Sequence, residues 1–402
     1  MRFKADSCGW QRIPIFELAE YVNGRATKPA ERVSDGVPVI KIAELTRGLS
    51  DRTDRVPAAR VQNRHWVRDG DLLFAWSGSV GVHVYRGDPA ALNQHIFRVV
   101  ARPGIDQRFL RYLLEGQMST FDGFVADKRT TMGHVTVADL KHTEVPVPPI
   151  EQQRSIARVL GSLDDRIESS QRIAKALEEI AATLFKALFV DFVDHDEVVE
   201  SEIGPIPSGW SAVPVSDIAT YVNGKAFTKF GNGRGRMVIR IAELRSGPGG
   251  STVYTDHGAE RDFRAQQGDI LFAWSGSLDV YRWHRNEALI NQHIFKVIPH
   301  EYPAWFVFRA LKHVMPHFQA IAADKATTMG HIKRSDLAGH SIAVPPSDVL
   351  AQQDAVHTPL FERALRARVE EESLSCVRDV LLPRLVSGQV GVLTADSEDP
   401  SA

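Results

Sequence analysis

The sequence predicts an α+β protein in which two similar α/β modules are separated by two long antiparallel helices. We expect the helices to form an intramolecular coiled coil, which makes the molecule pseudo-twofold symmetric. Two observations predict this fold. The stretch GDLLFAWSGSV at residues 70–80 returns as GDILFAWSGSL at residues 268–278, an offset of 198 residues. A helical pattern with apolar residues at heptad spacing follows the first copy, and a second helical pattern follows the second copy.

The first segment of each copy predicts a tight turn followed by a strand. Residues 9–24 read GWQRIPIFELAEYVNG, and residues 209–224 read GWSAVPVSDIATYVNG. Both end on Asn-Gly, which is a strong signal for a tight turn. Residues 37–45 and 237–244 then place β-branched side chains around Lys41 or Arg240, which indicates a strand.

Further segments recur in the same order in both copies. We expect a mainly buried strand in the DLLFAW and DILFAW stretches, a helix at 108–127 and 305–324, and a proline-rich strand at 145–149 and 343–346. The NQHIF segments at 93–97 and 291–295 are expected to hold backbone within the module, and we include Gln94 in that role. The loops KRTTMGH at 128–134 and KATTMGH at 325–331 could cradle a phosphate or simply cap the preceding helix.

The helix after the first copy carries a regular heptad seam. Its apolar positions are spaced alternately by four and three residues, with Ser170 as the exception, and include Ile156, Leu160, Leu163, Ile167, Leu177, Leu184 and Leu188. Roughly 35–40 residues of helix would span about 55 Å. The second helix is less regular and should end near Pro383. Its stripe is predicted to contain Leu360, Ala364, Ala367, Leu374, Val377, Leu381 and Leu385.

An exposed heptad seam is unfavourable, so the helices need a partner. Antiparallel pairing within one chain is our first expectation, and a homodimeric coiled coil is the alternative. The predicted divisions are module 1 at residues 1–149, helix 1 at 150–192, a linker with module 2 at 193–349, helix 2 at 350–386 and a flexible tail at 387–402.

Composition favours a cytoplasmic protein. The 402 residues have a net charge of −2, so bulk charge alone does not indicate a nucleic-acid binder. Cys8 and Cys376 lack metal-site spacing and are expected to be reduced thiols. The first residues do not resemble a signal peptide, and no apolar run reaches membrane-spanning length, so we expect no membrane partner.

No signature of an active site occurs in the sequence. GNGRGR at residues 231–236 lacks the GK[ST] ending of a phosphate-binding loop, and there is no HExxH, CxxC or GxSxG motif. The isolated histidines His95 and His293 are more typical of structural residues than of metal ligands. We therefore expect no catalytic residue, no metal and no cofactor bound by this chain, and interpret it as a binding or scaffold protein.

Three segments together resemble the specificity subunit of type I restriction-modification enzymes. They are PPIEQQRSIARVLGSLDDRIE at 148–168, the junction that starts LFKALFVDFVDHDEV at 184–198 and continues to residue 219, and LLPRLVSGQV at 381–390. Their order is that of the family, and the resemblance covers nearly the whole chain. The second helix entry, PPSDVLAQQD, departs from it by three additional residues and an alanine in place of Glu151.

The resemblance implies a non-catalytic subunit that reads DNA. Each module would be a target recognition domain for one half of a bipartite duplex target, and the helices would set the spacing, since half-sites on one face lie about 34 Å apart. Implied partners are adenine methyltransferase (modification) subunits and motor-nuclease (restriction) subunits. S-adenosylmethionine, ATP and Mg would be bound by those partners. The alternatives are a coiled-coil scaffold that joins two proteins without reading DNA and, less favoured, a homodimeric enzyme.

The candidate base-reading residues lie where the two copies differ. Segments 46–69 and 245–267 diverge while their flanks agree, and arginine and amide side chains can make bidentate contacts with base edges. A solvated surface is the alternative interpretation for each residue. The candidates there are Arg47, Arg52, Arg60, Arg64, Arg245, Arg261 and Arg264.

Other cations are candidates for groove or phosphate contacts in the flanking segments. They are Lys41 and Arg240 beside the strand, Lys28, Lys225 and Lys229 after the Asn-Gly turns, and Lys128, Arg129 and Lys325 in the TTMGH loops. A DNA contact by Trp76 or Trp274 is less favoured than a framework role. The similarity of the modules also predicts half-sites that are partly alike in inverted orientation.

Overall fold

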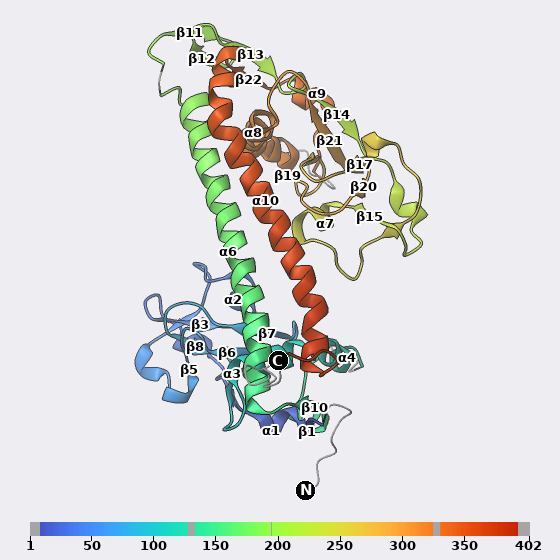
Figure 1. Ribbon diagram of the computed structural model, residues 1–402. Helices are drawn as coiled ribbons and strands as arrows, with labels where there is room; N and C mark the ends of the chain where they lie inside the picture. Colours follow the sequence, from blue (N-terminus) through green and yellow to red (C-terminus); the bar gives the residue numbers. More distant parts are fainter. Residues whose placement is uncertain (1–8, 128–132, 194, 325–329, 393–402) are drawn as a thin grey trace, which may run out of the picture. The chain divides into compact units, whose positions relative to one another are not determined.

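The computed structural model describes residues 9–127, 133–193, 195–324 and 330–392. The chain forms two compact units. Unit 1 contains the residues up to Asp165 together with those from Ser375 onward, and unit 2 contains Arg166–Leu374. Two long helices, α6 (Ile150–Phe189) and α10 (Ser347–Val386), each contribute to both units (Figure 1). The α+β class, the duplicated module and the long intervening helix are confirmed.

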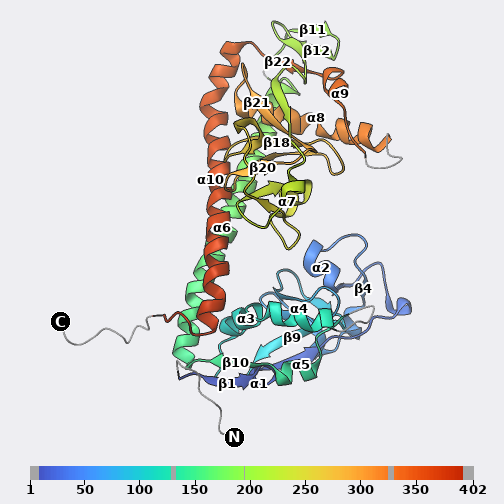
Figure 2. The same ribbon diagram turned by 90° about the vertical axis from the view of Figure 1, so that its right-hand side faces the viewer.

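Module 1, the part of unit 1 that precedes α6, contains two four-stranded sheets and one two-stranded pair. The sheet orders are β2-β9-β6-β7, β4-β3-β8-β5 and β1-β10, and β3 pairs with β8 in parallel. Helix α3 packs against β7 and β9 (Figure 2). The strands are β1 (Gln11–Pro14), β2 (Ala19–Asn23), β3 (Val37–Ile40), β4 (Arg55–Val56), β5 (Trp66–Val67), β6 (Leu72–Ala75), β7 (Gly81–Val84), β8 (Ala90–Leu92), β9 (Ile96–Ala101) and β10 (Glu144–Val147). The helices are α1 (Ile15–Leu18), η1 (Pro29–Glu31), α2 (Ile42–Arg47), η2 (Ala58–Arg60), η3 (Asn63–His65), α3 (Gln107–Glu115), α4 (Met118–Asp127) and α5 (Val137–His142).

Module 2, the part of unit 2 between α6 and α10, repeats this topology strand for strand. Its sheet orders are β14-β21-β18-β19, β16-β15-β20-β17 and β13-β22, with β15 parallel to β20, and an additional hairpin β11-β12 precedes them. The strands are β11 (Val198–Ser201), β12 (Gly204–Pro207), β13 (Ser211–Pro214), β14 (Ala219–Asn223), β15 (Arg236–Ile239), β16 (Tyr254–Thr255), β17 (Arg264–Ala265), β18 (Ile270–Ala273), β19 (Asp279–Arg282), β20 (Ala288–Ile290), β21 (Ile294–Pro299) and β22 (Ser341–Val344). The helices are η4 (Phe227–Phe230), α7 (Ile241–Ser246), η5 (Arg261–Phe263), α8 (Ala304–Asp324) and α9 (Arg334–Ala338).

The predicted strands at 37–45 and 237–244 are correct only in their first halves. Strand β3 ends at Ile40, and helix α2 begins at Ile42. The backbone N–H of Lys41 donates to the Glu44 carboxylate at 3.1 Å, and that of Arg240 donates to Glu243 at 3.0 Å. These carboxylates satisfy backbone donors that the first helical turn leaves unpaired, so each segment turns into a helix.

The helix predicted at 108–127 is interrupted in module 1. Helix α3 ends at Glu115 and α4 starts at Met118, whereas α8 is continuous in module 2. Gly116 lies at the interruption, where an added Cβ would come within 2.8 Å of Val386 and 3.3 Å of Leu382 on α10. The end of α10 therefore packs closely over the break.

The shared GDLLFAW stretch is framework, as predicted. All four residues of β6 and all four of β18 are buried. The tight turns predicted at Asn23-Gly24 and Asn223-Gly224 are absent, because the chain continues from β2 and β14 without a turn or bend. These segments instead connect the two sheets of each module, and Gly24 lies directly against the backbone of Leu92 and Asn93. Gly224 has the same relation to Ile290 and Asn291.

The predicted seam of α6 faces the interior of the two units. Ile156, Leu160 and Ile167 are buried, and Ser170, the exception in the heptad, is buried with them. The other predicted seam residues are half-buried, namely Leu163, Leu177, Leu184 and Leu188.

Helix α10 follows its predicted stripe less closely. Ala364, Ala367 and Leu385 are buried, and Leu360, Leu374 and Leu381 are half-buried. The prediction for Val377 is wrong, because its side chain is 46% exposed, whereas the neighbouring Arg378 is half-buried and binds Asp164 on α6.

Contacts within unit 2 establish antiparallel packing of the two long helices. Arg166 binds Glu370 at 2.9 Å, Glu178 binds Arg368 at 3.5 Å, and the ring of Phe189 lies 6.0 Å from that of His357. Residue numbers rise along α6 while those of the α10 partners fall. The predicted intramolecular pairing is therefore present in the described part of the chain.

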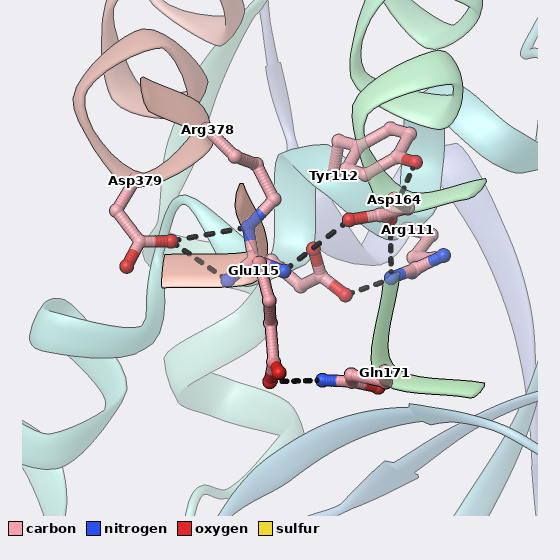
Figure 3. A network of polar contacts seen from close by, with 8 residues as sticks. Arg111, Tyr112, Glu115, Asp164, Gln171, Arg378 and Asp379 are labelled. Carbon is pink, nitrogen blue, oxygen red and sulfur yellow. Dashed lines mark hydrogen bonds and ion pairs between the residues drawn. The ribbon is translucent and has the colours of Figure 1, made fainter. Parts of the chain in front are cut away.

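In unit 1 a closed polar network joins α3, α6 and α10 (Figure 3). Asp164 accepts a hydrogen bond from the Tyr112 hydroxyl at 2.8 Å and binds Arg111 at 2.8 Å and Arg378 at 3.2 Å. Arg111 also binds Glu115 at 2.8 Å. Burial, followed by the hydrogen bond to Asp164, raises the pKa of Tyr112, so its hydroxyl keeps the proton that it donates.

Replacing Gly224 tests the sheet connection. We expect Gly224→Ala to lower the free energy of unfolding by about 1–3 kcal/mol, because the new methyl group would overlap backbone atoms that cannot move separately. Gly258→Ala is the control, since an added Cβ there meets no atom within 4 Å. Urea unfolding of both variants measures the difference, and equal stability of the two would contradict this packing.

His357 predicts a pH dependence of stability. Its side chain is 1% exposed and stacks on Trp305 at 4.2 Å, and burial lowers its pKa to about 4. Between this value and the ordinary pKa of about 6.5 the unfolded chain binds the proton more tightly than the folded chain. Stability should therefore fall as pH falls from 6.5 to 4, by about 2–3 kcal/mol from this residue. His357→Phe keeps the stacking and should remove that part of the slope in urea unfolding, whereas an unchanged slope would refute it.

Candidate nucleic-acid interface

Four segments that are distant in sequence meet beside the AWSGS motif of each module. We call this group the tryptophan cluster. It consists of Asn23, Trp76, Gln94, His95 and His134 in module 1, and of Asn223, Trp274, Gln292, His293 and His331 in module 2.

Backbone hydrogen bonds position the cluster. In module 1 the N–H of Val135 donates to the carbonyl of Trp76 at 2.8 Å, and the N–H of Gly78 donates to Gly133 at 3.2 Å. A bridge between Ser77 and His134 completes this short ladder. Module 2 repeats it, with Ile332 N–H donating to Trp274 at 3.1 Å and Gly276 N–H donating to Gly330 at 2.8 Å.

The glycine of the TTMGH loop is required by this arrangement. An added Cβ on Gly133 would lie 2.6 Å from the Val125 carbonyl oxygen of α4, and one on Gly330 would lie 2.5 Å from that of Ala322 in α8. The described end of each loop is thus held between the preceding helix and the AWSGS turn.

The side chains of the cluster are linked to one another. The indole Nε1 of Trp76 donates to Asn23 Oδ1 at 3.3 Å, and that of Trp274 donates to Asn223 at 2.9 Å. Both tryptophans are half-buried, so part of each indole is accessible. The amide nitrogen of Gln94 lies 3.1 Å from His95 Nε2.

The Gln94 side chain lies against one ring nitrogen of His95, and Gln292 lies in the same way against His293. The other ring nitrogen, Nδ1, is buried in both histidines and has no hydrogen-bond partner among the described residues. The two copies therefore share the same polar arrangement.

The expectation that Gln94 fixes the module backbone is wrong. Its side chain is exposed and reaches only the adjacent His95, whereas Asn93 is buried and its Oδ1 accepts the His95 backbone N–H at 3.3 Å. Gln94 and Gln292 thus present part of an amide group at the surface of the cluster.

The divergent segments present exposed cations. Arg47 ends α2, Arg52 lies in the following turn, Arg64 lies in η3, and Arg261 starts η5. No ion pair joins any of these four side chains to another residue in the described ranges, and Lys28 before η1 is exposed as well. These guanidinium groups are available to an incoming anion.

Other candidates already have partners within their modules. Lys41 pairs with Asp54, and Arg60 lies 3.7 Å from Glu31. The Lys28 backbone N–H, with Arg25 and Arg60, holds the pKa of Glu31 below its usual value, so this carboxylate stays charged.

The module 2 candidates show the same engagement. Arg264 donates to the Ala259 carbonyl at 2.8 Å, and Arg245 donates to the Ser277 hydroxyl at 3.2 Å. Lys225 lies 3.8 Å from Glu260, and Lys229 lies 4.9 Å from the centre of the Phe230 ring.

The position of Arg240 is decided by Glu243. Burial alone would raise the pKa of Glu243, but hydrogen bonds from the Arg240 side chain and backbone outweigh burial and lower it. Arg240 also donates to the Ser251 carbonyl at 2.8 Å, so it anchors the start of the divergent segment.

Three candidates, Lys128, Arg129 and Lys325, lie outside the described residues. Within the described ranges, no group of His, Cys, Asp and Glu side chains could hold a metal ion. None of the described helices has both the length and the apolar character needed to cross a membrane.

Sequence reasoning missed the tryptophan cluster as a unit. Its successive segments are separated by 18–53 residues and resemble independent framework motifs in the sequence. The available signal was their identity in both copies, including the polar Gln94 and Gln292, which a buried framework does not need.

Substitutions in the NQH segment test whether Gln94 is a surface residue and whether Asn93 holds the backbone. Gln94→Ala is expected to change the free energy of unfolding by no more than about 0.5 kcal/mol, because the side chain is exposed. Asn93→Ala should lower it by about 1–2 kcal/mol, because it removes a buried acceptor. Urea unfolding ranks the two, and a larger loss for Gln94→Ala would reverse the assignment.

The family described as the type I restriction modification DNA specificity domain matches the chain twice, at residues 8–179 and 207–358. The MjaIX type I specificity subunit of Methanocaldococcus jannaschii is 26% identical over 418 residues, covering 95% of this chain and 94% of that protein. The EcoBI specificity subunit of Escherichia coli is 25% identical over 224 residues, covering 52% of this chain and 46% of that subunit.

A solved structure has the same fold. The crystal structure of a type I restriction-modification S subunit from M. genitalium aligns with a TM-score of 0.58 at 17% identity, over 96% of this chain and 98% of that one. The two family matches cover most of the chain, one on each module. The chain therefore belongs to the specificity subunits of type I restriction-modification systems.

Proposed function

We propose that this chain reads a bipartite duplex DNA target, one half with each module, and performs no catalysis itself. The observation that carries the proposal is the contrast within each module. The strand topology and the tryptophan cluster are repeated, whereas the exposed basic segments differ. A reader of two related half-sites needs a common framework with different contact residues.

The exposed arginines supply suitable chemistry for base recognition. A guanidinium can donate two parallel hydrogen bonds to guanine O6 and N7 in the major groove. Arg47, Arg52, Arg64 and Arg261 are the best placed, because no carboxylate in the described part of their module forms an ion pair with them. Lys41, Arg60, Arg240 and Arg264 have partners already and are better suited to positioning.

The tryptophan cluster is proposed to contact a feature that both half-sites share. Gln94 and Gln292 are exposed, and each amide contacts the histidine that packs against the half-buried indole. A glutamine amide pairs with adenine N6 and N7, so an adenine at corresponding places in the two half-sites would suit both copies. The target is then partly alike in inverted orientation.

Partner subunits complete the proposed activity. Modification subunits would dock on the helices and methylate adenine with S-adenosylmethionine, and restriction subunits would supply the ATP- and Mg-dependent motor and nuclease. The net charge of −2 leaves little nonspecific attraction to DNA, so we expect strong binding only with a methyltransferase partner. A scaffold that joins proteins without reading DNA is the rival function.

A segment exchange tests the proposal. The chain is co-expressed with its methyltransferase partner, and methylated adenines are mapped genome-wide. Replacing residues 46–69 by 245–267 should change one half of the methylated motif toward the other half and leave the second half unchanged. Exchanging residues 70–80 for 268–278 is the matched control, because these framework stretches are nearly identical, and it should leave the motif unaltered.

Each outcome of this experiment separates the functions. A motif that follows residues 46–69 supports base reading by the divergent segment. An unchanged motif with normal methylation contradicts it, and methylation without any preferred sequence favours the scaffold.

A further inference from the structure

Unit 2 contains a cavity of about 420 Å³ whose wall is formed by α7, α8, β19 and α10, with Glu178 of α6 at its edge. Its charge is strongly asymmetric. Six cationic side chains line it but only two carboxylates, Glu178 and Glu371; the cations are Arg245, Arg282, Arg285, Arg309, Lys312 and Arg368.

Four of the six cations are neutralised by carboxylates. Arg282 binds Glu362 at 2.6 Å, Arg285 binds Glu372 at 2.9 Å and Lys312 binds Asp279 at 2.8 Å, and Arg368 is paired with both lining carboxylates at 3.3–3.5 Å. The fifth cation, Arg245, has only the Ser277 hydroxyl as a hydrogen-bond acceptor among the described residues.

Arg309 of α8 is different, because it is buried without an anion. Arg309 is only 9% exposed, and its Nε has no hydrogen-bond partner among the described residues. No carboxylate of the described residues forms an ion pair with its guanidinium. Its guanidinium lies 5.4 Å from the centre of the Phe308 ring. A buried charge normally has a counter-ion, since desolvation is expensive otherwise.

At the equivalent site in unit 1, carboxylates of the protein itself balance the charge of the arginines. Tyr112 stands at the position of Arg309, since each lies 22 residues before the histidine of its TTMGH loop. Tyr112 donates to Asp164, and the surrounding arginines are balanced by Asp164 and Glu115 (Figure 3). Lys312 takes the place of Glu115 in module 2, so module 2 has two cations where module 1 has a tyrosine and a carboxylate.

We propose that this cavity binds a small phosphate-bearing anion, of the size of a free nucleotide or smaller, with Arg309 and Arg245 as its principal ligands. Guanidinium groups match the geometry of phosphate oxygens, and the cavity volume lies within the range of small-molecule sites. A free phosphate ester fits better than duplex DNA, because a 9% exposed side chain is poorly accessible to a phosphate fixed in a double helix.

Burial lowers the pKa of the Arg309 guanidinium, and Glu178 opposes this effect only from a distance. Arginine nevertheless stays charged at neutral pH. The bound anion would remove this penalty and would connect α7 and α8 through Arg245 and Arg309, so occupancy should stabilise unit 2.

Thermal unfolding of the full-length chain, in buffer without phosphate and at constant ionic strength, tests the site with pyrophosphate and ATP as probes. The wild type should show a saturable rise in melting temperature. Arg309→Met should weaken the apparent affinity for the probes at least about tenfold. Without a probe, this variant should melt no lower than the wild type, because it removes an unpaired buried charge at similar volume.

Two further variants make the result decisive. Arg234→Met removes an exposed cation of the same module outside the cavity, and its response should equal that of the wild type. If Arg309→Met melts at a markedly lower temperature than the wild type without a probe, Arg245→Met is tested instead. Arg245 lines the cavity at an exposed position. Loss of the response in that variant supports the site, and an unchanged response overturns it.

Other results would also overturn the proposal. The first is a wild type whose melting temperature shows no saturable rise up to about 10 mM probe. The second is a melting temperature of Arg309→Met that responds to the probes as strongly as that of the wild type. The third is stabilisation by short duplex DNA that depends on Arg309 and is not reproduced by pyrophosphate or ATP. The last result would assign the cavity to the DNA backbone instead. None of these measurements depends on which sequence the protein reads.

Discussion

The hydrophobic core of each module is completed by side chains of both long helices, and the rest of the structure depends on this packing. In unit 1, Ile156 and Leu160 of α6 and Leu385 and Val386 of α10 join the module core. In unit 2, Phe185 and Phe189 of α6 and Phe361 of α10 do the same. Neither module can bury its apolar face without the helices, so the helices are structural parts of both modules as well as a connection in the chain between them.

This packing explains why the helix seam contains more than leucine. The faces of α6 and α10 contact each other and a module at the same time, so small, aromatic and polar residues are needed at different levels. Ala174 and Ser170 allow close approach, Phe189 fills the module core, and Asp164 collects the hydrogen bonds of the network in unit 1. A uniform apolar heptad would satisfy only the helix pair.

The two duplicated modules share one topology but differ in how charged side chains are arranged. The strand order and the tryptophan cluster are the same in both. At the contact between module and helices, however, Asp164 and Glu115 balance the arginines of the network around Tyr112. Arg309 instead lines a cavity and has no carboxylate partner among the described residues. Backbone packing is conserved more easily than charge here, because side chains can be replaced without moving the strands.

The sequence by itself determined the duplication, the buried β6 and β18 strands and the helix seam, because hydrophobic periodicity is local. It did not reveal that β3 and β15 give way to helices, since the capping carboxylates Glu44 and Glu243 compete with β-branched neighbours. Only the tertiary structure decided that Val377 faces solvent, that Trp76 meets His95 and His134, and that Arg309 is buried without an ion-pair partner among the described residues. These outcomes depend on contacts between residues far apart in the chain, whose geometry no local pattern encodes.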